Sequence, residues 1–289
     1  LTELWSRTAK LRDDCQRIVR AAFPGEKWTT LDLGYRDRMN TLERGWLVYA
    51  SAYVNGLKAL AVEHAWRSYL FGYFANAWMV PGSTFRQPQR PYVDALTQSP
   101  VNDLDGQLAT LRDDLLKRLR AAAVVSQTYE ESLPQMERRI AEVIGYPYAE
   151  ERIAEARVDV KRRLRQIAAK KTRGVFARAV GVVVGAGTRA VDQGRTDIEA
   201  ENVDLINGYI WHLSRFVTDH CNVCLARDKR WYASGSANPV PPEHKHCLCY
   251  CLAKARHMDE FGEEIPGPVV LRPYAEWALD AGVMYDGGL

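Results

Sequence analysis

Residues 41–78 have the sequence TLERGWLVYASAYVNGLKALAVEHAWRSYLFGYFANAW, in which apolar and aromatic side chains recur at helical spacing. No proline interrupts this stretch and Pro81-Gly82 follows it, so it predicts one unusually long helix. Because apolar side chains lie on nearly every side, we expect other helices or neighbouring subunits to bury it. Polar residues keep each apolar run short of the roughly 18 residues that a membrane span needs, so no membrane contact is predicted.

Similar patterns predict that most of the remaining chain is also helical. The first predicted helix ends at Pro24-Gly25, and a loop containing proline, glutamine and serine is expected at 81–102. With 47% hydrophobic and 26% charged residues, the composition is that of a folded globular protein. The predicted helices are 2–22, 41–78, 104–126, 130–144, 149–172, a further helix that reaches Asp197 or beyond, and a short one at 273–281.

The cysteines are concentrated at one end of the chain. Six occur in 289 residues, and five of them lie between residues 221 and 251, beside several histidines. A secreted disulfide scaffold spreads its cysteines through a short chain, whereas one Cys/His cluster in a long chain is typical of a metal site. Cys15, the sixth, is expected to be a buried apolar residue on its helix.

The spacing within the cluster predicts a structural zinc site. Cys221-Asn-Val-Cys224 can direct two thiolates at one ion from a tight turn. We predict Cys221 and Cys224 as ligands, with a second pair drawn from His244, Cys247 and Cys249. His246 and Cys251 are expected to pack around the site. Another metal, or cysteines that are reduced or partly paired without a metal, are the alternatives.

The sequence changes character near Asn207-Gly208, because residues 209–218 carry β-forming side chains and predict a strand. We therefore expect a mainly α protein, in which a multi-helix N-terminal body carries a small α+β zinc-binding C-terminal module. The predicted boundaries are 1–200 for the body, 201–256 for the module and 257–289 for a tail.

One ordered series of motifs runs through this region. Its members are Gly187-Thr-Arg-Ala-Val-Asp-Gln-Gly194-Arg195, Trp211, Asp219-x-Cys221-x-x-Cys224 and Pro241-Pro-x-His244-x-x-Cys247-x-Cys249. This order resembles the phage Mu F-like, or phage head morphogenesis, family over residues 180–255. In that family a helix with a Gly-Arg end precedes a Trp-containing strand, a D-x-C-x-x-C turn and a P-P-x-H-P-x-C-R-C segment. The family often has a glycine soon after the cysteine pair, where this chain has Arg227-Asp-Lys-Arg-Trp231, and an arginine where it has Leu248.

The resemblance implies a structural, non-enzymatic minor head (capsid) protein of a tailed bacteriophage that acts in head morphogenesis near the portal. It implies that the protein is assembled in the host cytoplasm and resides in the virion. The implied partners are portal or major capsid subunits, with packaged DNA as a further candidate and no small-molecule substrate. Zinc would be a structural cofactor.

The segment 152–178 is strongly basic, with ten Lys and Arg against Glu155 and Asp159. Such a helix could contact phosphates, an acidic protein partner or only solvent, although the formal charge of the whole chain is just +3. The predicted nucleic-acid or partner contacts are Arg157, Lys161, Arg162, Arg163, Arg165, Lys170 and Lys171.

Two other functions are compatible with parts of the sequence. A metal-dependent nuclease or toxin-like effector module could use Asp219-His220 beside the cluster, but catalytic zinc needs an open coordination position and this cluster has surplus ligands. A zinc-stabilised DNA-binding protein could use the basic segment. The glycines between Gly181 and Gly187 lack the spacing and Lys-Ser/Thr of a phosphate loop, so we expect them to serve close helix packing or to break a helix.

Overall fold

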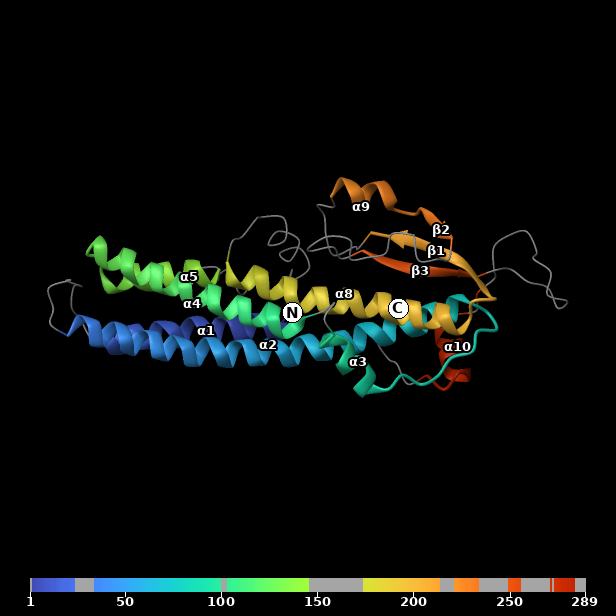
Figure 1. The fold of residues 1–289 in the computed structure, drawn as a ribbon, viewed down its shortest axis with the longest axis horizontal. Helices are drawn as coiled ribbons and strands as arrows, with labels where there is room; N and C mark the ends of the chain where they lie inside the picture. The colour runs from blue at the N-terminus through green and yellow to red at the C-terminus, as the bar shows by residue number, and fades with distance from the viewer. Residues whose placement is uncertain are drawn as a thin grey trace. The chain divides into compact units, whose positions relative to one another are not determined.

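The computed structural model describes residues 2–23, 34–99, 103–145, 174–213, 221–233, 249–255, 271 and 273–283. This part of the chain is mainly helical, as predicted, and contains a three-stranded sheet (Figure 1). It forms two compact units: unit 1 comprises residues 1–60 and 103–183, and unit 2 comprises residues 61–102 and 184–289. The predicted boundary at residue 200 falls within unit 2. None of the described helices is both long and apolar enough to cross a bilayer.

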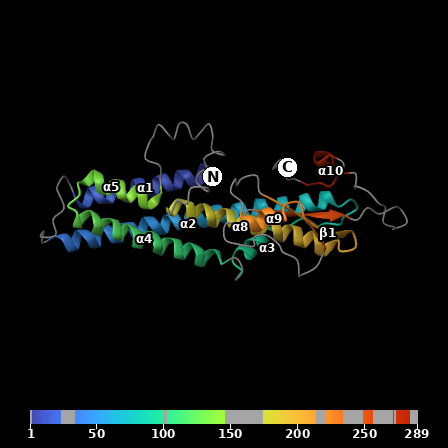
Figure 2. The ribbon, with the colours of Figure 1, turned by 90° about the horizontal axis from the view of Figure 1, so that it is seen from above.

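Unit 1 is a helical bundle with an aliphatic core. In Figures 1 and 2, α1, α4 and α5 run alongside the first part of α2. This part of α2 is buried on one side only, since Trp46 is buried whereas Leu47 and Val48 are exposed. The helices that contribute are α1 (Thr2–Ala22), α2 (Tyr35–Met79), α4 (Leu104–Thr128), α5 (Leu133–Ile144) and the start of α8 (Val175–Glu201). The largest buried aliphatic side chains are Leu4, Leu42, Leu57, Leu104, Leu108, Leu115, Leu119, Met136 and Ile140.

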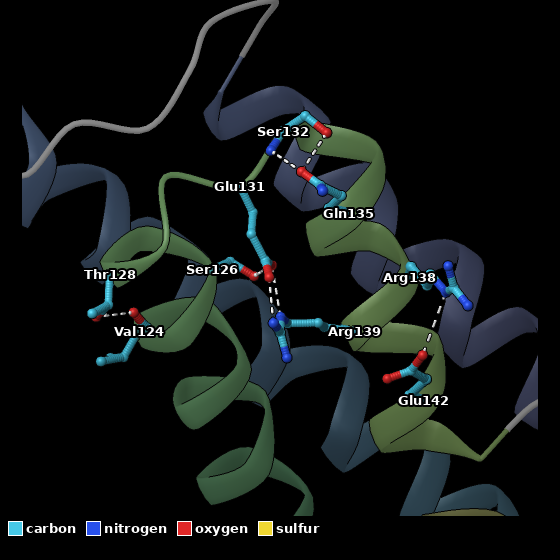
Figure 3. A network of polar contacts seen from close by, with 9 residues as sticks. All are labelled: Val124, Ser126, Thr128, Glu131, Ser132, Gln135, Arg138, Arg139 and Glu142. Atoms are coloured by element: carbon cyan, nitrogen blue, oxygen red, sulfur yellow. Dashed lines mark hydrogen bonds and ion pairs between the residues drawn. The ribbon is translucent and has the colours of Figure 1, made fainter.

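Polar contacts fix the turn between α4 and α5 (Figure 3). Ser132 and Gln135 form a capping box, in which each side chain satisfies a backbone group at the start of α5. The Arg139 guanidinium donates two hydrogen bonds to the Glu131 carboxylate, which also accepts one from the Ser126 hydroxyl. These contacts explain why the chain reverses within four residues after α4 ends at Thr128.

Unit 2 combines helices with the small sheet. The strands are antiparallel in the order β2-β1-β3, with Trp211 of β1 opposite Cys251 of β3. Residues 72–77 of α2 are buried without a break, so the predicted all-round burial is confirmed for this part of the helix. The elements are the second part of α2, α3 (Arg90–Thr97), the rest of α8, β1 (Ile206–His212), α9 (Asn222–Arg227), β2 (Trp231–Ala233), β3 (Tyr250–Ala255) and α10 (Tyr274–Asp280).

Glycines bring α2 and α8 into backbone contact in unit 2. A Cβ atom at Gly194 would lie 2.5 Å from the Tyr69 carbonyl oxygen, and one at Gly187 would lie 2.8 Å from the Ser68 hydroxyl oxygen. The prediction of close helix packing is therefore confirmed for Gly187, whereas the alternative of a helix break is wrong, because α8 runs without a break from Val175 to Glu201. Only a residue without a side chain allows this approach.

Some predicted boundaries were wrong. The loop predicted at 81–102 contains α3, because Pro91 stands in the first turn of that helix, where its missing N–H costs no hydrogen bond. The long helix begins at Tyr35 rather than at residue 41, and the strand predicted at 209–218 spans Ile206–His212. Residues 214–218 and the helix predicted at 149–172 lie outside the described residues.

Candidate functional site

Five side chains in unit 2 form a buried cluster, here called the cysteine core: Tyr209, Trp211, Cys224, Cys249 and Cys251. Tyr209 and Trp211 are two residues apart on β1, so they lie on the same face of the sheet. Cys251 stands opposite Trp211 on β3, and opposite residues of an antiparallel pair share a face. The core thus joins Cys224 of α9 with Cys249 and Cys251, which follow it in the sequence by 25 and 27 positions.

Cys224 is the anchor of α9. This helix has six residues, and Cys224 is its only buried one, at 2% exposure, whereas Val223 and Leu225 are about half exposed. Cys221 caps the helix, because its sulfur accepts a hydrogen bond of 3.4 Å from the Cys224 N–H. A helix this short is not stable on its own. Its position is held by the two cysteines, by Arg227, whose guanidinium lies 5.3 Å from the Trp211 ring centroid, and by the turn after the helix. In that turn the Lys229 N–H donates to the Trp211 carbonyl oxygen at 2.8 Å.

The structure places three of the five predicted zinc ligands. Cys221 and Cys224 lie at the start of α9, and Cys249 is buried in the cysteine core just before β3. Among the described residues, no group of three or more His, Cys, Asp and Glu side chains is arranged to hold a metal ion. His244 and Cys247 lie outside the described residues, as do all seven predicted basic contacts. A zinc site drawn from the five predicted ligands would therefore need His244 or Cys247.

Cys251 and Cys15 have the burial that the sequence predicts for packing residues. Both are fully buried. Cys15 lies on α1 in unit 1, where burial raises the pKa of its thiol to about 12. That thiol therefore stays protonated at neutral pH and acts as an apolar group.

A buried ion cluster joins α8 to the sheet beside the cysteine core. The Arg195 guanidinium is 3% exposed and pairs with the carboxylates of Asp192, at 3.1 Å, and Glu199. It also lies 4.7 Å from the Tyr209 ring centroid. Burial lowers the pKa of Arg195, but the two carboxylates outweigh burial and leave that pKa above its ordinary value.

Burial also raises the pKa of Asp192, which the Arg195 cation opposes. The sequence indicated Arg195 only as part of a motif, and this cluster was not predicted. The spacing of Asp192, Arg195 and Glu199, three and four residues apart on one helix, is the available indication.

A second polar network joins α2, α3 and α8 in unit 2. The Tyr69 and Tyr92 hydroxyls both donate to the Asp197 carboxylate, at 2.5 and 3.1 Å. Asn202 donates to the Thr84 carbonyl oxygen and accepts from the Thr84 N–H, which fixes the segment before α3. None of these residues was singled out from the sequence, because only the tertiary structure brings them together.

Searches against protein-family models, curated proteins and solved structures find no match for this chain. Any assignment of function therefore rests on its own residues and their arrangement.

Proposed function

We propose that this chain is a structural minor head protein of a tailed bacteriophage, whose C-terminal module is held together by one zinc ion. One observation carries the proposal: motif residues from separate segments meet at a single core. Trp211, Cys224 and Cys249 are members of the cysteine core, and Arg195 contacts its Tyr209 ring. Cysteine and tryptophan are often buried in any fold, so the support comes from separate segments of the motif series meeting at one core, not from burial alone.

The conformation of Lys229 adds support. Its φ angle is 60°, in the left-handed region that glycine adopts without strain. Lys229 lies within Arg227-Asp-Lys-Arg-Trp231, where the head morphogenesis family often has its glycine. Its N–H donates to the Trp211 carbonyl oxygen at 2.8 Å, so the turn is tied to β1. The backbone thus has the conformation that the family's glycine would favour.

The two cysteines at the start of α9 support the zinc ion, because the Cys221 sulfur lies 3.4 Å from the backbone nitrogen of Cys224. The proposed ligands are Cys221 and Cys224, with a second pair from His244, Cys247 and Cys249 that includes at least one residue of the segment 234–248. Thiolate and imidazole ligands suit zinc, and four protein ligands would make the ion a cross-link without chemistry of its own. Its binding free energy would then stabilise the fold of the module.

Metal analysis of the purified, reduced, full chain tests the zinc site. We expect one zinc per chain in the unaltered protein and none in the Cys221→Ser/Cys224→Ser variant. Cys15→Ala is the matched control, because Cys15 is buried in unit 1, and it should retain the metal. Reduced protein that holds no zinc after chelator-free purification would contradict the metal site.

Co-expression with the portal and major capsid proteins encoded in the same genome tests the head function. We expect the chain to sediment with the assembled particles, and the double-cysteine variant to be lost from them. A chain that stays out of the particles would contradict the proposal. Metal-dependent cleavage of DNA by the purified chain would instead support the nuclease alternative.

A further inference from the structure

A cavity of about 490 Å³ lies in unit 2, where the helices α2 and α10 end. Its walls include three aromatic side chains from separate segments: Trp78 in the last turn of α2, Phe85 in the segment that follows, and Trp277 in α10. The volume is within the range of small-ligand sites, roughly 300–1,000 Å³. Each of the three aromatic residues is only partly buried, so these walls remain accessible to solvent.

The aromatic rings hold one another in place. The ring centroids of Phe85 and Trp277 are 5.6 Å apart, and their planes are inclined by 50°. Tyr274 lies behind them, with its ring centroid 5.7 Å from that of Trp78 and 5.7 Å from that of Trp277. The rings are therefore positioned before a ligand arrives, which lowers the entropy cost of binding.

The charges around the cavity favour a cation. Both helices that border it end there, α2 at Met79 and α10 at Asp280, and the C-terminal end of a helix carries partial negative charge. Among the described residues that line the cavity, Asp280 has the one charged side chain. Aromatic rings add to this preference, because the faces of their π-systems attract cations. The same groups would repel a phosphate or a carboxylate.

Elsewhere in unit 2, a ring and a carboxylate with the same spacing bind an arginine. Glu63 and Trp66 are three residues apart on α2. The Arg90 guanidinium lies 5.5 Å from the Trp66 ring centroid, and its Nη1 atom lies 2.9 Å from a Glu63 carboxylate oxygen. Trp277 and Asp280 have this spacing on α10 in the opposite order, so their side chains also lie on one side of a helix. A guanidinium suits such a pair better than an ammonium group, because it is planar and weakly hydrated.

We propose that this cavity binds the guanidinium of an arginine side chain that a partner protein presents. The flat group would lie against the Trp277 ring and donate hydrogen bonds to the Asp280 carboxylate. The site is separate from the cysteine core and needs no zinc. It therefore goes beyond the proposed head function, and either proposal can fail without the other.

A titration of the full chain with the amide of Nα-acetylarginine tests the site. The readout is the indole N–H resonances of Trp78 and Trp277, assigned with Trp78→Phe and Trp277→Phe. We expect saturable shifts of both resonances. The corresponding citrulline amide is the control probe, because it has nearly the same shape but no charge. It should bind about fivefold to tenfold more weakly.

Two substitutions identify the groups that recognise the cation. Asp280→Asn should weaken binding of the arginine amide about threefold to tenfold, because it removes the charge and keeps the shape. Asp204→Asn is the matched control: it removes the same charge from an exposed position of unit 2 that does not line the cavity, and affinity should not change. Trp277→Leu should weaken binding about fivefold, whereas Trp277→Phe keeps an aromatic face and should retain most of the affinity.

Three results would overturn the proposal. Equal affinities for the arginine and citrulline amides would show that the cavity does not recognise charge. Unchanged affinity in Asp280→Asn, a conservative change at an exposed position, would exclude the carboxylate as a partner of the guanidinium. Tighter binding of a proline-rich peptide than of the arginine amide would assign the aromatic walls to an extended proline ligand instead.

Discussion

The two units fill their interiors in different ways. Unit 1 packs leucine, isoleucine and methionine side chains between its helices, and its Arg–Glu pairs lie at the surface. Unit 2 buries a guanidinium, that of Arg195, and packs Gly194 against the backbone of α2. Unit 1 also buries polar groups, such as Thr8 and Ser126, and has one backbone contact of this kind between Gly145 and Gly174, but it buries no guanidinium among its described residues. Side-chain packing tolerates small adjustments, whereas backbone contacts and buried charges have few alternatives. We therefore expect unit 2 to respond more strongly to small substitutions.

Helix α2 is buried to different extents in its two parts. The first part of α2 has one buried side, with Leu47 and Val48 exposed at 47% and 63%, while residues 72–77 are buried on all sides. Both parts are rich in apolar residues. The comparison teaches that apolar content alone does not reveal how many neighbours a helix segment has. Small residues do not reveal it either, because Ala52 and Ala59 in the first part are exposed whereas Ala75 and Ala77 in the second part are buried.

Removing a buried cation should have the largest effect. Arg195→Met would leave Asp192 and Glu199 buried without their partner, and we expect the free energy of unfolding to fall by about 3–5 kcal/mol. Arg120→Met, at an exposed pair with Glu43 in unit 1, should cost at most about 1 kcal/mol. Chemical denaturation of both variants checks the difference. Equal losses would show that Arg195 is not part of a tightly buried cluster.

The next largest difference between the two units should be the change in stability when a glycine is replaced by alanine. In unit 2, Gly194→Ala places its Cβ 2.5 Å from one backbone atom and 2.6 Å from another, so α2 and α8 must move apart. We expect a loss of about 3 kcal/mol, the upper end for overpacking. In unit 1, Gly56→Ala meets only the flexible end of Arg7, and the better helix propensity of alanine should stabilise the chain by up to about 1 kcal/mol. A destabilising Gly56→Ala would break the contrast.

Alkaline unfolding should report on a buried tyrosine of unit 1. Tyr53 is 5% exposed, and burial raises its pKa from 10.0 to about 12. Because the folded pKa lies above the unfolded one, this contribution to stability is complete below pH 10 and is lost as the pH rises to 12. The loss should amount to about 2–3 kcal/mol.

Tyr53→Phe should remove this part of the pH dependence, although at neutral pH it also loses the hydrogen bond between Tyr53 and Thr8. Tyr92 in unit 2 is the comparison. Burial and the Asp197 carboxylate raise its pKa to about 12 as well, but the side chain is 44% exposed. Solvent screening should make the effect of Tyr92→Phe smaller. Parallel stability curves for Tyr53→Phe and the unaltered chain above pH 10 would contradict the assignment.

The sequence predicts helix ends best where a nearby glycine or proline marks them. Helix α1 is confirmed at residues 2–22, and α5 ends before Gly145, as the glycine predicts. The miss at α3 has a local cause too, since the proline taken as a loop residue belongs to the first turn of a helix. Continuous apolar periodicity located α2, but its start at Tyr35 precedes the strongly apolar residues.

The candidate site was only partly predictable. The cysteine spacing singled out Cys224 and Cys249, and the structure brings both to the cysteine core. Spacing is informative here because the backbone of one turn places Cys221 and Cys224 close together. The burial and the partners of Arg195 depend on side-chain conformations and on neighbours from other elements. Arg195 was part of a predicted motif, but the sequence of that motif does not show that this arginine is buried and paired with two carboxylates.

The smallest expected effect concerns backbone strain. Lys229→Gly should stabilise unit 2 by up to about 1 kcal/mol, because glycine adopts a φ of 60° without the strain that a side chain adds. The hydrogen bond from this N–H to Trp211 is kept in the variant. Gly145→Ala in unit 1 is the opposite control: its φ is 77°, and the added Cβ would lie 2.9 Å from the Gly174 Cα, so stability should fall by at least about 1 kcal/mol. Chemical denaturation measures both changes. A Lys229→Gly variant that is less stable than the unaltered chain would mean that the lysine side chain contributes more than its strained backbone costs, and the parallel with the family's glycine would then lose its physical basis.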